Sequence, residues 1–110
     1  MKDPRIYLEH MLECIERIEL YTELGEAHFL SHIQAQDSVY RNFEIIGEAS
    51  KRIPESLKLK APTVPWKDIA GFRDVLIHQY DGVDPNEVWV IIEEDLVMLK
   101  EAILSLIDQL

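Results

Sequence analysis

Apolar residues recur every three or four positions along most of this chain, which is the spacing of amphipathic helices. The first helix is predicted to begin at Asp3, an N-cap carboxylate followed by Pro4, and to stop at Gly25. Residues 27–33 are compatible with one or two further turns of helix. The pattern therefore indicates a helical chain from its first residues onward.

The second predicted helix runs from about Asp37 to Ile53, because Pro54 disfavours helical backbone in the residue before it. Gly47 lies inside this helix, where glycine costs about 1 kcal/mol relative to alanine. A glycine in such a place is typical of a close approach by another helix or a ligand.

Three prolines mark residues 54–65 as a connection that holds about one turn of helix. The third helix is predicted from about Pro65 to Tyr80, before an Asp-Gly turn. Residues 84–87, Asp-Pro-Asn-Glu, have the pattern of a capping box. They are predicted to begin a fourth helix that fills the remainder of the chain.

The last predicted helix carries two apolar stripes. The first stripe alternates steps of four and three residues, like the seam of a bundle: Ile92, Leu96, Leu99, Ile103, Leu106 and Leu110. The second repeats every seven residues on another face: Val90, Val97 and Leu104. It indicates either a surface covered in a homodimer or a helix that is central in its own bundle. The predicted fold is all-α, an antiparallel four-helix bundle with an extra short helix in a connecting loop.

The chain has 110 residues, 47% of them apolar, which predicts one domain over residues 1–110 with a core of its own. The net charge of −10 argues against a nucleic-acid partner, whose phosphates need basic groups. However, residues 41–80 hold seven basic and five acidic side chains, whereas both flanking segments are strongly acidic. A polyanion can therefore meet the middle segment, although a merely soluble acidic protein is the alternative.

No apolar run approaches the ~18 residues of a membrane span, and no apolar signal core follows the first residues, so we expect a cytoplasmic protein without membrane contact. The single cysteine, Cys14, fits a reducing compartment.

His28 and His32, like His10 and Cys14, stand four residues apart, which is a metal-ligand spacing on a helix. Neither pair has an obvious third ligand nearby, and we expect no metal or other cofactor.

The segment 71–80 places Arg73, Asp74, His78 and Tyr80 among apolar residues. Arginine offers a planar, permanently charged fork for a phosphate, and histidine moves protons near neutral pH. Together they suffice to cleave RNA by attack of the 2′-hydroxyl on the adjacent phosphorus. On a straight helix, however, Arg73 and His78 point about 140° apart. Either the helix breaks near residues 77–79 or two protomers complete one site. The alternative is that Arg73 pairs with a carboxylate, His78 caps a helix end and Tyr80 is part of the core.

The spacing Arg73-x4-His78-x-Tyr80 resembles the signature of the HepT toxins, which are small helical ribonucleases of the HEPN superfamily. Similarity to the family extends over nearly the whole chain and includes Ile45 to Ala49, Pro65 to Asp74, Val83-Asp84, Val88-Trp89 and Asp95-Leu96 with Leu99. The resemblance implies a HEPN-like bundle that dimerises, with the Arg–His motifs of two protomers facing one cleft.

The resemblance also implies a metal-independent endoribonuclease toxin of bacteria or archaea, acting on RNA such as tRNA or mRNA. In that assignment Arg73 binds the phosphate, His78 is the general acid or base, and Asp74 and Glu48 have supporting roles. The implied partner is a nucleotidyltransferase antitoxin of the MntA type, which silences the toxin by attaching AMP to Tyr80. The alternatives are a non-catalytic helical binding module that partners a nucleotidyltransferase and, more remotely, an interaction protein with a histidine metal site.

Overall fold

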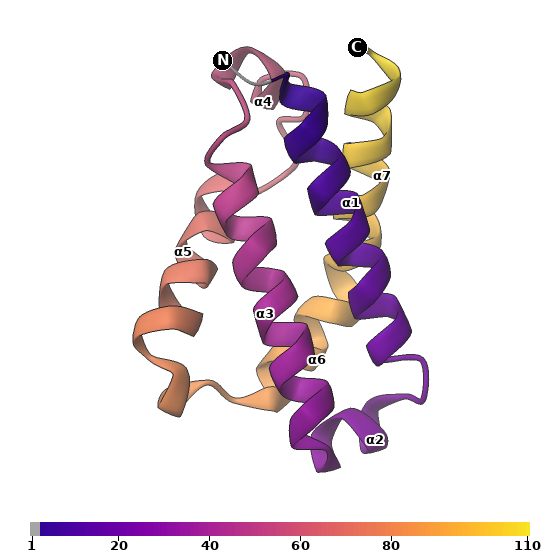
Figure 1. Cartoon of the computed structure of the whole chain (residues 1–110), viewed down its shortest axis with the longest axis vertical. Helices are drawn as coiled ribbons and strands as arrows, with labels where there is room; N and C mark the ends of the chain where they lie inside the picture. The colour runs from indigo at the N-terminus through magenta and orange to yellow at the C-terminus, as the bar shows by residue number, and fades with distance from the viewer. Residues whose placement is uncertain (1–2) are drawn as a thin grey trace.

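The computed structural model describes residues 3–110, and within them all regular structure is helical (Figure 1). The elements, in chain order, are α1 (Pro4–Tyr21), α2 (Glu26–Ser31), α3 (Ile33–Ser50), α4 (Glu55–Lys58), α5 (Trp66–His78), the 3-10 turn η1 (Tyr80–Gly82), α6 (Pro85–Glu94) and α7 (Leu96–Asp108). The predicted all-α class, the short helix in the connection and the turns after Gly25 are confirmed.

Four long segments run antiparallel in the order α5, α3, α1, α7 across the molecule (Figure 1). The central pair, α1 and α3, has the most extensive contact, with α5 on the far side of α3 and α7 on the far side of α1. The short helix α2 packs against α3 and α6 at one end of the bundle. Among the described residues, α5 has no other extensive contact besides α3 and the η1 turn that follows it.

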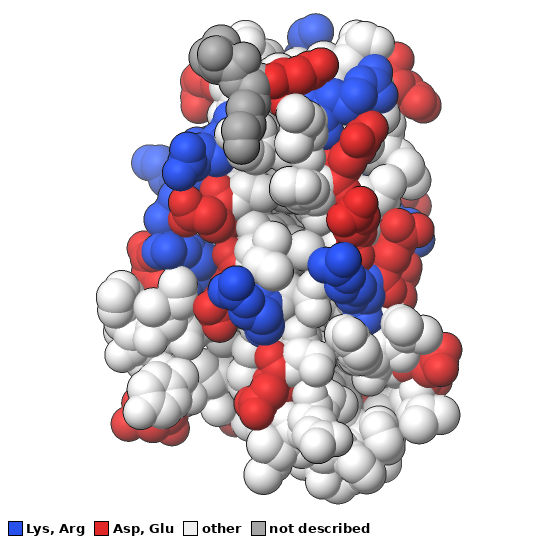
Figure 2. All heavy atoms as spheres, viewed as in Figure 1, with Lys and Arg blue, Asp and Glu red and all other residues white. Residues whose placement is uncertain are grey.

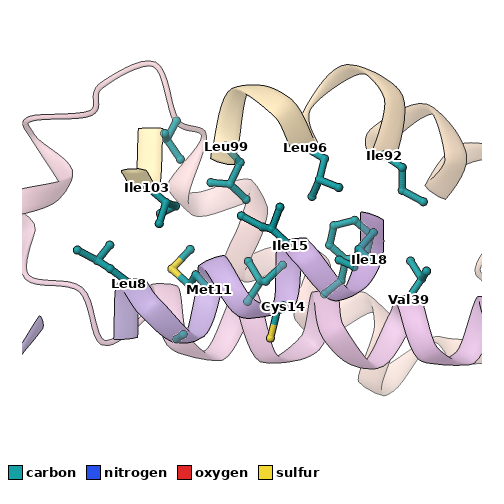
Figure 3. Close-up of a cluster of buried hydrophobic side chains, with 14 of the residues drawn as sticks. Leu8, Met11, Cys14, Ile15, Ile18, Val39, Ile92, Leu96, Leu99 and Ile103 are labelled. Atoms are coloured by element: carbon teal, nitrogen blue, oxygen red, sulfur yellow. The ribbon is translucent and has the colours of Figure 1, made fainter. Parts of the chain in front are cut away.

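The core forms where the apolar faces of α1, α3 and α7 meet. Side chains of α1, including Met11, Ile15 and Ile18, point toward those of α6 and α7 (Figure 3). The seam predicted for the last helix is buried from Ile92 to Leu106, whereas Leu110 is exposed. Burial of this kind contributes about 25 cal/mol per Å² of apolar surface removed from water, and it is the main force that holds the helices together.

The second stripe of the last helix is not covered. Val90, Val97 and Leu104 have 48%, 57% and 43% of their surface exposed. The alternative that this helix is central in its own bundle is therefore wrong, and an apolar face remains open on the chain. No helix within residues 3–110 is long and apolar enough to cross a membrane.

Several predicted boundaries are corrected. The last helix does not run unbroken, because it turns at Asp95 and becomes α6 and α7. Aspartate is a poor helix former in a helix interior, and the change of direction lets α6 reach α2 while α7 continues along α1. The third helix ends at His78 rather than Tyr80.

The ends of α3 and the start of α6 also differ in detail from the prediction. After His32, an N-cap with extended backbone, α3 begins at Ile33, four residues earlier than predicted, and it ends at Ser50 rather than Ile53. The Ser50 hydroxyl donates a hydrogen bond of 2.7 Å to the carbonyl of Gly47. The Asp84 N-cap is confirmed, since its carboxylate accepts from the backbone N–H of Asn86 at 2.9 Å. No hydrogen bond from the Asp84 backbone N–H to Glu87, the reciprocal bond of a capping box, is formed among the described residues. The Asn86 side chain instead donates a second hydrogen bond to the same Asp84 oxygen, at 3.1 Å.

Candidate functional site

Gly47 sets the distance between α3 and α5. A Cβ atom built on Gly47 would collide with the Cβ of Arg73 and would lie 3.1 Å from both the Arg73 Cγ and the backbone oxygen of Ile69. The two helices can therefore pack this closely only because position 47 has no side chain. The predicted close approach at this glycine is confirmed, and it presses the stem of Arg73 against α3.

Two carboxylates hold the guanidinium of Arg73. Its Nε lies 3.3 Å from an oxygen of Glu48 on α3, and its Nη1 donates to Asp74 at 3.0 Å. Each carboxylate has a second basic partner, Arg52 at 3.5 Å from Glu48 and Lys51 at 3.6 Å from Asp74. Five charged side chains thus form one continuous network with one more positive than negative group.

This network changes the ionisation of Asp74. The hydrogen bond from Arg73 lowers the pKa of that carboxyl below its ordinary value, and the charges of Lys51 and Arg73 act in the same direction. Asp74 therefore stays ionised, and it keeps the guanidinium of Arg73 oriented along α5. The pairing of Arg73 with a carboxylate, which the sequence analysis gave as part of the alternative to a catalytic role, is present in this chain, and its partners are Asp74 and Glu48.

His78 and Tyr80 lie where α5 ends. His78 is exposed and occupies the last turn, and among the described residues its ring has no hydrogen bond or ion pair. Gln79 leaves the helix, with φ −128° and ψ 35°, and Tyr80 begins the η1 turn. Tyr80 is 76% exposed, so the alternative that it belongs to the core is wrong.

The helix remains regular from Arg73 through His78, so it does not bring the two side chains together. Arg73 and Ile77, one turn apart on the same face of α5, both line a groove between α1, α3 and α5, whereas His78 does not line it. The helix does break within residues 77–79, at Gln79, but His78 still belongs to α5, so the break does not bring His78 to Arg73.

The groove beside Arg73 has a volume of about 350 Å³ and lies between α1, α3 and α5. Tyr7 and His10 line it from α1, and the side from α3 and its C-terminal turn is lined by Arg41, Glu44, Ile45, Glu48, Ala49 and Arg52. Figure 2 shows this face, with basic side chains over the α3 and α5 side interleaved with acidic ones. The sequence interpretation missed Arg41 and Arg52 as site residues, although positions 41, 45, 48 and 52 have helical spacing.

The two metal-ligand spacings lead to different environments. The rings of His28 and His32 stack with centroids 3.8 Å apart, and Nδ1 of His32 lies 3.0 Å from the carbonyl oxygen of His28. His10 is exposed, whereas Cys14 is buried in the core, and burial raises the pKa of its thiol. Among residues 3–110 no three potential ligand side chains come together.

Comparison with known proteins places these features in a family. A model of the ribonuclease HepT-like family matches residues 11–106. The chain is 44% identical over 110 residues to a protein of Methanocaldococcus jannaschii named "Gamma-glutamylcyclotransferase and putative RNase", covering 99% of this chain and 50% of that protein. It is 46% identical over 95 residues to a probable ribonuclease HepT of Thermococcus cleftensis, covering 86% of each.

A tRNA nuclease HepT of Aphanizomenon flos-aquae is 38% identical over 93 residues, covering 82% of this chain and 56% of that protein. The chain thus spans about half of two of these relatives and most of the third. No solved structure gave a significant match. The chain is a small helical bundle of the HEPN type, and it belongs to the ribonuclease HepT-like family.

Proposed function

We propose that this chain is a metal-independent ribonuclease toxin that cuts RNA with Arg73 and His78. Family membership supports the reaction class, and the relatives named ribonuclease HepT and tRNA nuclease HepT support RNA, with tRNA as the first candidate and mRNA as the second. The observation that carries the proposal is the position of the two side chains on α5, where Arg73 is fixed by packing and His78 is free at the helix end.

In the proposed reaction the 2′-oxygen of one nucleotide bonds to the adjacent phosphorus while the bond from phosphorus to the 5′-oxygen breaks. His78 accepts the proton of the 2′-hydroxyl, and a protonated imidazole gives a proton to the leaving 5′-oxygen. Arg73 stabilises the charge that develops on the non-bridging oxygens. The products are a 2′,3′-cyclic phosphate and a 5′-hydroxyl, and no step needs a metal.

The geometry supports a homodimer as the active form. Because Arg73 and His78 point in different directions along an unbroken helix, one phosphate can meet both kinds of group only if a second copy contributes. Gly71 supports this, since a Cβ atom at this position in the middle of α5 would meet nothing within 4 Å. Val75, one turn after Gly71 on the same face of α5, is also more than a third exposed. A second α5 can approach closely at such a face.

An apolar groove on the other side of α5 provides further surface for the second copy. It lies between α5 and the α6–α7 segment, and its floor is α3; the lining side chains include Phe43, Ile69, Phe72, Ile91, Met98 and Leu99. This groove and the open stripe of Val90, Val97 and Leu104 are apolar surfaces that are exposed to solvent in the single chain. Surface of this kind is typical of protein interfaces.

We further propose that an MntA-type nucleotidyltransferase silences this cytoplasmic toxin by attaching AMP to Tyr80. The exposure of Tyr80 supports this, because a transferase can reach its hydroxyl without unfolding α5. The adduct would place a phosphate at the end of the helix that carries Arg73 and His78. That phosphate would compete with the RNA phosphate and lower the positive potential.

A second candidate is a non-catalytic binding module that holds a nucleotidyltransferase. The two carboxylates on Arg73 favour it, because an arginine with both edges paired is also what a purely structural role requires. The two candidates differ in a simple way: the module forms a stable complex with the transferase but does not cut RNA when purified alone.

The deciding experiment incubates the wild type and His78→Ala with total RNA and with tRNA in EDTA, followed by analysis of the product ends. We expect the wild type to leave cyclic-phosphate ends and the variant to leave the RNA intact. The protein must first be shown by mass to carry no adenylate. An unmodified wild type that leaves RNA intact would favour the binding module.

A further inference from the structure

We infer that the groove between α1, α3 and α5 binds the RNA backbone on both sides of the cleaved phosphate, with Arg41 and Arg52 as ligands of the flanking phosphates. This inference rests on the proposed ribonuclease function and extends it to residues outside the Arg–His motif. Arg73 connects the groove to the Arg–His motif, because it lies on the motif helix α5 and also lines the groove.

The charge of the groove is opposite to that of the protein. The chain as a whole carries −10, yet three arginines and only two glutamates line this groove. His10 adds an imidazole from the α1 wall. Affinity for a nucleic-acid strand comes largely from basic groups that neutralise phosphates, so an acidic protein needs one local surface where they prevail.

The arginines are spread along the groove rather than gathered at one point. Arg41 and Arg52 are eleven residues apart on α3 and its C-terminal turn, about 16 Å at 1.5 Å per residue. Arg73 reaches α3 between them, beside Gly47 and Glu48. The groove therefore offers separate cations to successive phosphates of one strand, with the motif arginine in the middle.

Unlike Arg73, the two outer arginines of the groove, Arg41 and Arg52, are held only by exposed ion pairs. Arg41 lies 3.5 Å from Glu44, and Arg52 lies 3.5 Å from Glu48, while both guanidinium groups remain mostly exposed. Exposed pairs of this kind contribute about 0–1 kcal/mol. A phosphate can therefore take over these guanidinium groups without a large loss of stability, and the glutamates meanwhile keep the arginines near the groove.

The test measures binding of a single-stranded 2′-O-methyl oligoribonucleotide, which lacks the attacking hydroxyl and cannot be cut. The variants are Arg41→Gln, Arg52→Gln and the double variant. Arg17→Gln is the matched control, because Arg17 is a half-exposed arginine on α1 that pairs with Glu13 at 4.0 Å and lies outside the groove. Far-UV circular dichroism verifies that every variant keeps the helical content of the wild type.

Each single variant should lose about one phosphate contact. The slope of log K against log salt concentration should then become shallower by about 0.7, and binding should weaken about fivefold at 0.1 M salt. For the double variant the same slope should become shallower by about 1.4, and binding should weaken about 25-fold. Arg17→Gln should show neither change. If the double variant binds with the affinity and salt dependence of Arg17→Gln, or if the wild type does not bind the probe, the groove assignment is wrong.

The two proposals fail separately. Groove-dependent binding by a protein that never cuts unmodified RNA would support the groove and overturn the ribonuclease function. Cleavage that needs His78 but is unaffected by the double groove variant would do the reverse.

Discussion

The close approach at Gly47 makes a quantitative prediction about stability. In Gly47→Ala the new Cβ would overlap the Cβ of Arg73, and both atoms are fixed to backbone, so no side-chain rotation relieves the overlap. The backbone oxygen of Ile69, 3.1 Å from the same point, prevents a shift in that direction. The helices must therefore separate, and overpacking of this kind costs up to about 3 kcal/mol.

Alanine also returns about 1 kcal/mol of helix propensity at this position. The expected net loss is therefore about 2 kcal/mol in the free energy of unfolding. For a domain of this size that loss lowers Tm by roughly 8 °C. Gly71→Ala is the matched control, because it changes the same atom in a helix interior where a Cβ would meet nothing within 4 Å.

The assay is urea unfolding followed by circular dichroism at a protein concentration where all variants are monomeric, because Gly71 lies on the proposed dimer face and assembly would shift apparent stability. We expect Gly71→Ala to be as stable as the wild type or more stable, and Gly47→Ala to be less stable than both. Equal stability of the two alanine variants would refute the close packing of α3 against α5.

Three further predictions follow from single side chains. Tyr80→Phe should prevent the addition of adenylate mass during coexpression with the transferase, while thermal unfolding stays unchanged because Tyr80 is exposed; adenylate on the variant would contradict the assignment. Arg73 lowers the pKa of Asp74 in the folded state, so the wild type should have a higher Tm than Asp74→Asn above the ordinary aspartate pKa. This difference in Tm should be lost as the pH falls through the lowered pKa of Asp74, and a difference that persists in acid would be inconsistent with this. Burial raises the pKa of the Cys14 thiol, so a thiol reagent should react slowly with native protein and rapidly in urea; equally rapid reaction in both would contradict its burial.

Much of the fold can be predicted from the sequence, because helical periodicity and capping residues are local signals. Asp3 and Asp84 both cap helices as expected, with side-chain oxygens that accept backbone N–H groups. The turn at Asp95 could not be predicted in this way, since the apolar spacing continues across it from Ile92 to Leu96. Its cause lies in tertiary packing, as α6 and α7 face different neighbours.

The same distinction between local sequence signals and tertiary packing applies to the candidate site. The motif residues could be found because Arg73, His78 and Tyr80 are close in sequence, and Gly47 stood out as a glycine inside a helix. The helical spacing of Arg41 and Arg52 shows that they share a face, but which groups surround Arg73 depends on how α1, α3 and α5 pack. The pairing of Arg73 with Glu48 likewise joins residues from different helices.

The position of α5 at the edge of the bundle has a consequence for motion. A helix with one extensive helical neighbour opens at a lower free-energy cost than α1 or α3, which are packed on two sides. Amide hydrogens of α5 should accordingly exchange with solvent faster than those of the central pair. The segment that carries Arg73 and His78 is supported by one long helix of its own chain, α3, so its order depends in part on what binds its open faces.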